Sequence, residues 1–245
     1  MSFSNFSFSL KEGLTSSSNT ATIRAYVISL RHENRLRNIE EQQRKLSFEV
    51  EIFDAVKGDK LDLSKVENLR GGHYATVPED YWKRRTVGCY LSHLNIMKMI
   101  KEKNYQGYTI VFEDDFKITT TSFYDDVMKI INTCNENQYK FDLIILGNKN
   151  DNRGQNLKDN IYTFDKSKVS YGTHGYIVNN SHVDKIINAI KFIDYEIDVK
   201  YSRLAADGKL DILMIYPYLV FQQPEKFSSE ILDKSIETFV SFQNV

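Results

Sequence analysis

The first patterned segments of the chain alternate between strand-like and helix-like sequences. Residues 25–30 (AYVISL) form a short apolar run with β-branched side chains, which is typical of a buried strand. Residues 33–46 then carry three spaced aliphatic side chains among charges, as a surface helix does. Residues 50–55 (VEIFDA) alternate like a second strand and end at a Lys-Gly-Asp turn. A strand, a helix and a strand in this order predict an α/β fold with a parallel sheet.

The same alternation continues along the chain. Residues 108–112 (YTIVF) are the clearest buried strand. Further helices are predicted at residues 88–103, 123–134 and 181–193, and further strands at residues 142–146, 169–178 and 210–220. Irregular segments are predicted at residues 61–81 and 148–160. No repeat and no break in composition marks a second domain. We therefore expect a flexible Ser-rich arm at residues 1–22 and a single α/β domain with a mostly parallel sheet at residues 23–245.

Charge and cysteine content exclude several classes of protein. The 32 Lys and Arg and 33 Asp and Glu give a net charge of -1, whereas a nucleic-acid-binding surface is strongly basic. Two cysteines are too few for a disulfide framework or a Cys-based zinc site. No apolar run approaches the ~18 residues of a membrane helix, and the arm lacks the basic start of a secretory signal. We expect a cytoplasmic protein with no nucleic-acid partner.

Three adjacent acidic residues follow the clearest strand. Glu113, Asp114 and Asp115 stand at its carboxyl end, where open α/β sheets bind their ligands. Adjacent carboxylates repel one another unless water or a cation neutralises them, and hard divalent cations prefer oxygen ligands. The triplet therefore indicates a metal site, with a solvated acidic turn as the alternative.

A second polar group lies at the start of the helix predicted at residues 88–103. Gly88 lets a ligand or another part of the backbone approach closely, and Ser92 and His93 are polar positions on an otherwise apolar helix. The alternative is ordinary capping with a hydrogen-bonded core histidine. A Ser-His nucleophile pair is not expected, because adjacent helix residues do not face each other. Nearby, Trp82 and the basic residues 83–85 form a local basic and aromatic cluster.

The order of these segments resembles glycosyltransferase family 25, the lipooligosaccharide and collagen galactosyltransferase family. The Gly-Cys-x-x-Ser-His pattern is complete at residues 88–93, and the strand running into Glu-Asp-Asp follows it. The remaining matches are Ser29-Leu30-Arg31 with Arg35, residues 53–58, residues 173–176, Ile197-Asp198, residues 217–222 and Ser229-Glu230-Ile231. Ser29 and Glu230 depart from the frequent Asn and Asp of the family, and both replacements are chemically close.

The resemblance implies a fold and a reaction. It implies a GT-A fold, a Rossmann-like domain that binds a nucleotide sugar. It also implies a metal-dependent, inverting transfer of a hexose, typically galactose, from a UDP-sugar to an acceptor hydroxyl. The acceptor would be a glycan, a lipooligosaccharide or a hydroxylysine-type protein side chain. The protein would be peripheral to a membrane where a lipid-linked acceptor lies. Trp82 and residues 83–85 would contact an anionic acceptor or form a solvated loop. Mn²⁺ or Mg²⁺ would neutralise the departing diphosphate. The transferred sugar, the acceptor and the oligomeric state stay open.

Residue roles follow from the same resemblance. Asp115 would bind the metal directly, and Glu113 would bind the metal or sugar hydroxyls. Asp114 would contact one of these or turn away. The expected donor-binding residues are Arg31, Ala55, Gly88, Ser92, His93, Glu113, Asp114 and His174. Of the two spaced arginines, Arg31 is favoured over Arg35 for phosphate or base recognition, with a solvated helix face as the alternative.

Inversion needs a base that takes the proton of the acceptor hydroxyl. Asp198 matches the acidic position of the family pattern, and Asp194 and Glu196 are rival bases. The structural alternative for Asp198 is a salt-bridged surface acid. Two other functions remain open: a metal-dependent phosphoryl-transfer or hydrolytic enzyme that uses the same acidic strand end, and a non-catalytic relative. The first lacks a P-loop motif.

Overall fold

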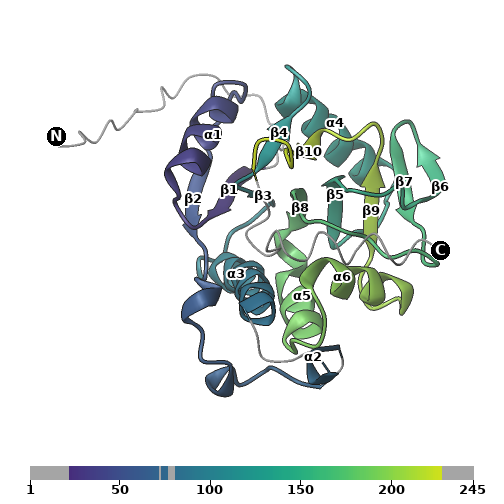
Figure 1. Ribbon diagram of the computed structural model, residues 1–245. Coiled ribbons are helices and arrows are strands. Elements are labelled where there is room, and N and C mark those ends of the chain that lie inside the picture. Colours follow the sequence, from purple (N-terminus) through teal and green to yellow (C-terminus); the bar gives the residue numbers. More distant parts are fainter. Residues whose placement is uncertain (1–21, 72, 77–80, 228–245) are drawn as a thin grey trace, which may run out of the picture.

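The computed structural model describes residues 22–71, 73–76 and 81–227, which form an α/β structure (Figure 1). Its main sheet has eight strands in the order β2-β1-β3-β8-β5-β9-β7-β6. These are β1 (Ile23–Ser29), β2 (Glu51–Asp54), β3 (Tyr108–Glu113), β5 (Leu143–Gly147), β6 (Arg153–Lys158), β7 (Ile161–Phe164), β8 (Gly175–Asn179) and β9 (Ile212–Ile215). Six strands run in one direction, and β7 and β8 run against them. The predicted α/β class with a mostly parallel sheet is confirmed.

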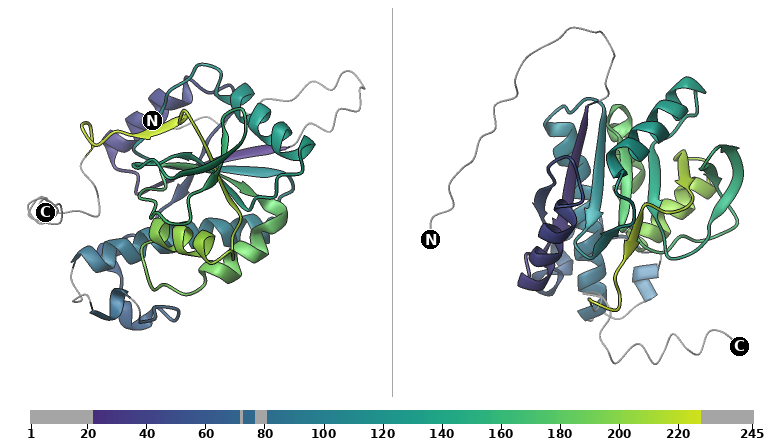
Figure 2. Two further views of the ribbon diagram at one scale, coloured as in Figure 1. Left: turned by 90° about the vertical axis from the view of Figure 1, so that its right-hand side faces the viewer. Right: turned by 90° about the horizontal axis from the view of Figure 1, so that it is seen from above.

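Helices cover both faces of this sheet (Figure 2). One face carries α1 (Glu33–Gln43) and α4 (Phe123–Glu136), and the other carries α3 (Tyr81–Glu102), α5 (Val183–Ile190) and α6 (Ile197–Ala206). Alternate residues of β1 enter the two cores: Val27 packs with the α4 side, and Tyr26 and Ile28 pack with the α3 side. Because both faces are buried, the central strands are continuously apolar rather than alternating.

The smaller elements complete the frame. A second sheet pairs β4 (Phe116–Ile118) antiparallel with β10 (Val220–Gln222). A four-residue helix, α2 (His73–Thr76), precedes α3, and 3-10 turns occur at η1 (Gly58–Lys60), η2 (Leu63–Lys65) and η3 (Asn180–His182). No helix in the described part of the chain is both long and apolar enough to cross a membrane. The predicted arm, apart from Thr22, and the family-like Ser229, Glu230 and Ile231 lie outside the described residues.

The strand directions bring several chain segments to one edge of the sheet. β1, β2 and β3 are parallel, so their last residues, Ser29, Asp54 and Glu113, lie at the same edge. β8 runs against β3, so its beginning lies there too, and the Glu113 N–H donates to the His174 carbonyl at 3.2 Å. Pairing of β10 with β4 adds Gln222 opposite Phe116. The acidic triplet therefore sits where these ends converge.

Several predicted elements differ from the observed ones. The helix expected at residues 88–103 begins at Tyr81, so Gly88 to His93 lie in the middle of α3 and not at its start. The charged residues 83–85 obscured its first turns. The segment at residues 148–160, expected to be irregular, contains β6, whose mostly exposed side chains carry no apolar alternation. The strand expected at residues 210–220 is split between β9 and β10.

Candidate active site

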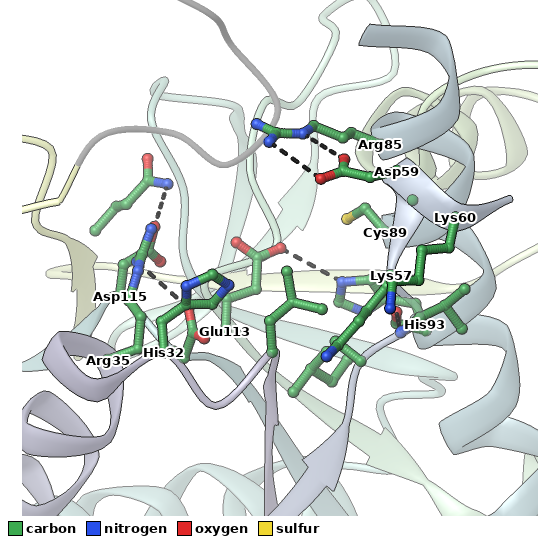
Figure 3. A pocket seen from close by; sticks show the side chains of 18 residues that line it. His32, Arg35, Lys57, Asp59, Lys60, Arg85, Cys89, His93, Glu113 and Asp115 are labelled. Carbon is green, nitrogen blue, oxygen red and sulfur yellow. Dashed lines mark hydrogen bonds and ion pairs between the residues drawn. The ribbon is translucent and has the colours of Figure 1, made fainter. Parts of the chain in front are cut away.

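A cavity of about 310 Å³ opens at the edge of the sheet where the strand ends converge (Figure 3). It is bounded by β1, β3 and α3, by the segment before and within η1, and by β10. The residues that line it are Ile28, Leu30, His32, Arg35, Ala55, Val56, Lys57, Gly58, Asp59, Lys60, Arg85, Cys89, Ser92, His93, Glu113, Asp114, Asp115 and Gln222. The acidic triplet and the Ser-His pair of α3 therefore face one space.

A buried arginine neutralises two of the three acidic residues. The Arg35 side chain is only 2% exposed, and its Nη1 lies 3.3 Å from Asp114 Oδ1 and 3.1 Å from Asp115 Oδ2. The Ser29 hydroxyl donates to Asp114 Oδ2 at 2.7 Å. Burial raises the pKa of Asp114 to about 6, although Arg35 and Ser29 oppose the shift. Asp114 is thus turned toward β1 and α1 by its partners.

Asp115 carries one oxygen that is engaged and one that is not. Its Oδ2 accepts from Gln222 Nε2 at 2.9 Å and pairs with Arg35. Its Oδ1 is buried and has no hydrogen-bond partner. A buried, unpaired carboxylate oxygen is costly unless a further group completes it. The free Oδ1 atom is therefore suited to act as an oxygen ligand of a divalent cation.

Glu113 is bound from the opposite side of the cavity. Its Oε1 accepts a hydrogen bond from the Thr173 hydroxyl and lies 3.4 Å from Nε2 of the fully buried His93. The other ring nitrogen of His93, Nδ1, lies 2.8 Å from the Tyr176 hydroxyl. Burial acts to raise the pKa of Glu113, but the hydrogen bond and charge of His93, with help from His174 and Thr173, lower it to about 2. Glu113 is therefore ionised at neutral pH.

Gly88 and Ser92 shape the wall of the cavity. A Cβ on Gly88 would lie 2.9 Å from Gly58 Cα and from the Val56 carbonyl oxygen, so the glycine admits the backbone of residues 56–58 against α3. The Ser92 hydroxyl donates to the Gly88 carbonyl at 2.8 Å and accepts from the Val56 N–H at 2.9 Å. Of the two readings of Gly88, the structure shows a close approach of backbone. This contact positions Ala55 and Lys57 in the lining.

Asp198 supports the segment that enters β8. Its Oδ2 accepts from the Gly172 N–H at 2.7 Å and its Oδ1 from the Val199 N–H at 2.8 Å. Burial raises its pKa, against the effect of these two donors. Gly172 has a positive φ of 98°, and a Cβ there would lie 2.1 Å from the His174 ring. Asp198 and His174 do not line the cavity. Asp198 nevertheless binds Gly172, whose neighbour Thr173 donates a hydrogen bond to Glu113.

The other predicted residues occupy different environments. Arg31 pairs with Asp54 on the surface, with side chains 48% and 76% exposed, and does not line the cavity. Asp194 pairs with Lys200 Nζ at 2.6 Å, and Glu196 lies 3.5 Å from His73 Nε2. The structure thus brings Ala55, Ser92, His93, Glu113, Asp114 and Asp115 together in the lining of the cavity. It places Arg31, Gly88, His174 and Asp198 outside that lining.

A rim of basic residues faces the acidic triplet. Lys57, Lys60 and Arg85 line the cavity, and Arg85 Nε donates to Asp59 Oδ1 at 2.8 Å. The sequence predicts a turn at residues 57–59, which overlaps the family-like segment 53–58, and a loop or acceptor surface at residues 83–85. The two glycines, Gly58 and Gly88, are the sequence feature that could have indicated this rim, because they allow η1 to pack directly against α3. Cations opposite carboxylates suit a ligand that carries phosphates and a metal together.

Comparison with known proteins places these residues in one family. A family model described as glycosyltransferase family 25 (LPS biosynthesis protein) matches residues 22–201. Procollagen galactosyltransferase 2 of Homo sapiens is 26% identical over 184 residues, which cover 71% of this chain and 28% of that protein. A glycosyltransferase 25 family member of Drosophila melanogaster is 27% identical over 173 residues, covering 68% and 28%. The match therefore spans about 28% of the length of these relatives.

Solved structures show weaker likeness. A197 from STIV aligns over 81% of this chain and 82% of its own, with 11% identity and a TM-score of 0.41. Mannose-1-phosphate geranyltransferase from Thermus thermophilus aligns over 79% and 73%, with 10% identity and a TM-score of 0.35.

Proposed function

The chain belongs to glycosyltransferase family 25, and on this premise we propose that it moves a hexose from a UDP-sugar to an acceptor hydroxyl with inversion. Galactose is the proposed sugar, because the relatives include procollagen galactosyltransferases. The proposed acceptor is a glycan, a lipooligosaccharide or a hydroxylysine-type side chain. We assign the domain to the GT-A class of nucleotide-sugar-binding folds.

The main support for this proposal is the Oδ1 atom of Asp115, a residue that lines the cavity just after β3. This atom is buried and has no hydrogen-bond partner. Glu113 and Asp115 would hold Mn²⁺ or Mg²⁺, and the bound ion supplies Lewis-acid neutralisation of a diphosphate leaving group. Arg35 and Gln222 keep Asp115 oriented through its other oxygen. The hydrogen bond that Asp114 accepts from Ser29 and its ion pair with Arg35 favour a positioning role for that residue over metal ligation.

The basic rim supports a nucleotide diphosphate as the donor. Lys57 and Lys60 are exposed at the cavity, across from the carboxylates. Ammonium groups bind phosphate as mobile point charges. A UDP-sugar would lay its diphosphate between this rim and the acidic triplet, with Ala55 and Ser92 in the wall beside it.

Asp198 is the proposed base. Its rivals Asp194 and Glu196 are engaged with Lys200 and His73, whereas Asp198 accepts only backbone N–H groups. A raised pKa from burial suits a group that takes a proton during the reaction. Asp198 does not line the cavity, but it is half-buried and holds Gly172, the neighbour of the Thr173 that bonds Glu113. An acceptor that extends the cavity on this side would give its hydroxyl proton to Asp198 as the new glycosidic bond forms and the bond from the sugar to UDP breaks.

Transfer of labelled sugar from a panel of UDP-sugars to glycan or hydroxylysine acceptors, with release to water as the background, tests the reaction. With Mn²⁺ present, wild type should turn over one UDP-hexose in preference to the others. Asp198→Asn should lower kcat by about 10²- to 10⁴-fold while donor binding, measured by thermal shift, is retained. The control is Asp125→Asn, an exposed carboxylate on α4 that does not line the cavity. Release of phosphate instead of sugar would favour a hydrolase, and donor binding without turnover would favour a non-catalytic relative.

A further inference from the structure

Three potential metal ligands of different chemistry meet on the α3 side of the cavity. The Cys89 sulfur, a ring nitrogen of His93 and a carboxylate oxygen of Glu113 all lie within 4.8 Å of one another. Figure 3 shows them on one side of the cavity, across from Arg35 and Asp115. We propose that these three side chains form a second cation site, selective for a thiophilic divalent ion of the zinc type.

Local structure brings the three ligands together. Cys89 and His93 are four residues apart on α3, so they project from the same helix face. Glu113 is the last residue of β3, which packs beneath that helix. The cysteine count excluded a site made from cysteines alone, but a mixed site needs only one, and the contact between α3 and β3 supplies the third ligand.

The distances fit tetrahedral zinc. Zinc–nitrogen and zinc–oxygen bonds of about 2.0–2.1 Å at tetrahedral angles place the two ligand atoms about 3.3–3.4 Å apart. His93 Nε2 and Glu113 Oε1 are 3.4 Å apart. In such a site the Cys89 sulfur would lie about 3.6 Å from the histidine nitrogen. The two atoms are at most 4.8 Å apart in the structure. A movement of the sulfur by about 1 Å, through a change in the χ1 angle of Cys89, would therefore complete the site.

The histidine is already held in the orientation that a metal requires. Its Nδ1 lies 2.8 Å from the Tyr176 hydroxyl, which leaves Nε2 as the nitrogen that lies 3.4 Å from Glu113 Oε1. The ring is fully buried and cannot swing into solvent. Metal-binding histidines are usually fixed through their second nitrogen in this way. Tyr176 is therefore the positioning residue of the site.

The donor set separates this site from the acidic pair. A thiolate with imidazole and carboxylate suits zinc, whereas Mn²⁺ and Mg²⁺ prefer oxygen ligands. Binding converts the Cys89 thiol to a zinc-bound thiolate, and the displaced proton passes to solvent. Asp115, held by Arg35 and Gln222, is outside the triad. Three protein ligands leave the fourth zinc position open to the cavity.

Glu113 is shared between the two sites, which gives zinc a regulatory consequence. An ion bound to Cys89, His93 and Glu113 removes a ligand from the Mn²⁺ site, so zinc should inhibit competitively with Mn²⁺. This consequence rests on the proposed function, whereas zinc binding does not. The test therefore measures binding of the metal alone.

Competition of the full chain with a chromophoric chelator for Zn²⁺ measures the site directly. Cys89→Ala should weaken zinc binding by at least about 100-fold, more than the 10- to 100-fold cost of removing an outer partner. Cys134→Ala, at a buried thiol on α4 in the other core, and Asp115→Asn should bind within about two-fold of wild type. Equal binding by Cys89→Ala and wild type, or loss in Asp115→Asn alone, would overturn the proposal.

Two further variants keep the test independent of folding. Tyr176→Phe preserves the buried ring but removes the hydroxyl beside His93, and should weaken zinc binding by about 10- to 100-fold. Cobalt(II) substituted for zinc should give thiolate-to-metal charge-transfer absorption in wild type and Cys134→Ala, and none in Cys89→Ser. Absence of this absorption in wild type, or its persistence in Cys89→Ser, contradicts cysteine ligation whatever the transferase activity of the chain.

Discussion

Replacing Arg35 with methionine tests whether the acidic triplet depends on a buried cation. The guanidinium is 2% exposed, lies 3.3 and 3.1 Å from Asp114 and Asp115, and packs over the Phe227 ring at 4.6 Å. Methionine keeps most of the length of the side chain but leaves the two carboxylates without their shared positive charge. Removing one partner of a buried pair costs about 3–5 kcal/mol. For a chain of this size that corresponds to a fall in Tm of about 6–20 °C.

Arg31→Met is the matched control for this loss. Arg31 pairs with Asp54, but both side chains are largely exposed, so the pair contributes about 0–1 kcal/mol. Thermal and urea unfolding of both variants give the comparison. Saturating Mn²⁺ should restore part of the stability of Arg35→Met, because a cation at Asp115 replaces some of the missing charge. If Arg35→Met is no less stable than Arg31→Met, the reasoning about the buried pair is wrong.

Two further predictions concern the wall of the cavity and pH. Gly88→Ala would gain about 1 kcal/mol of helix propensity, but its Cβ meets the backbone of residues 56–58 at 2.9 Å, and overpacking costs about 1–3 kcal/mol. We expect a net loss in urea unfolding, and a stabilised variant would contradict that close contact. Burial raises the pKa of Asp198, so its contribution to stability is complete below the unfolded pKa and is lost as pH rises through the folded one. The difference in unfolding free energy between wild type and Asp198→Asn should therefore fall as the pH rises. A difference that grows with pH would contradict the raised pKa of Asp198.

The layered α/β fold could be predicted because its central strands are buried on both faces. The apolar runs at β1 and β3 predict strands in the centre of the sheet, because their side chains need to be covered by helices on both faces. The hairpin strand β6 could not be predicted, because its side chains are mostly exposed and its pairing with β7 shifts register at two points, at the first of which the Thr163 hydroxyl accepts from the Gln155 N–H. The first turns of α3 were obscured by the charged residues 83–85, which are half-buried, with Lys83 Nζ donating to the Tyr74 carbonyl at 2.6 Å and Arg85 at the cavity rim.

The acidic triplet could be predicted as a site, since it follows a buried strand and therefore lies at the carboxyl edge of the sheet, where α/β proteins bind ligands. The choice between Arg31 and Arg35 could not. Both follow β1, but a positive φ of 60° at Arg31 and the start of α1 decide which side chain turns inward. The meeting of Cys89 and His93 with Glu113 was equally hidden, because it depends on how α3 lies on β3.

The central claim is that Asp115 helps to hold the divalent cation on which donor binding depends. Calorimetric titration of the full chain with the UDP-sugar that it turns over, with and without Mn²⁺, tests this claim most directly. Binding should require Mn²⁺ in wild type and in Asp125→Asn, and should be lost in Asp115→Asn while the unfolding transition remains cooperative. Equal binding without Mn²⁺, or unchanged binding in Asp115→Asn, would contradict the account.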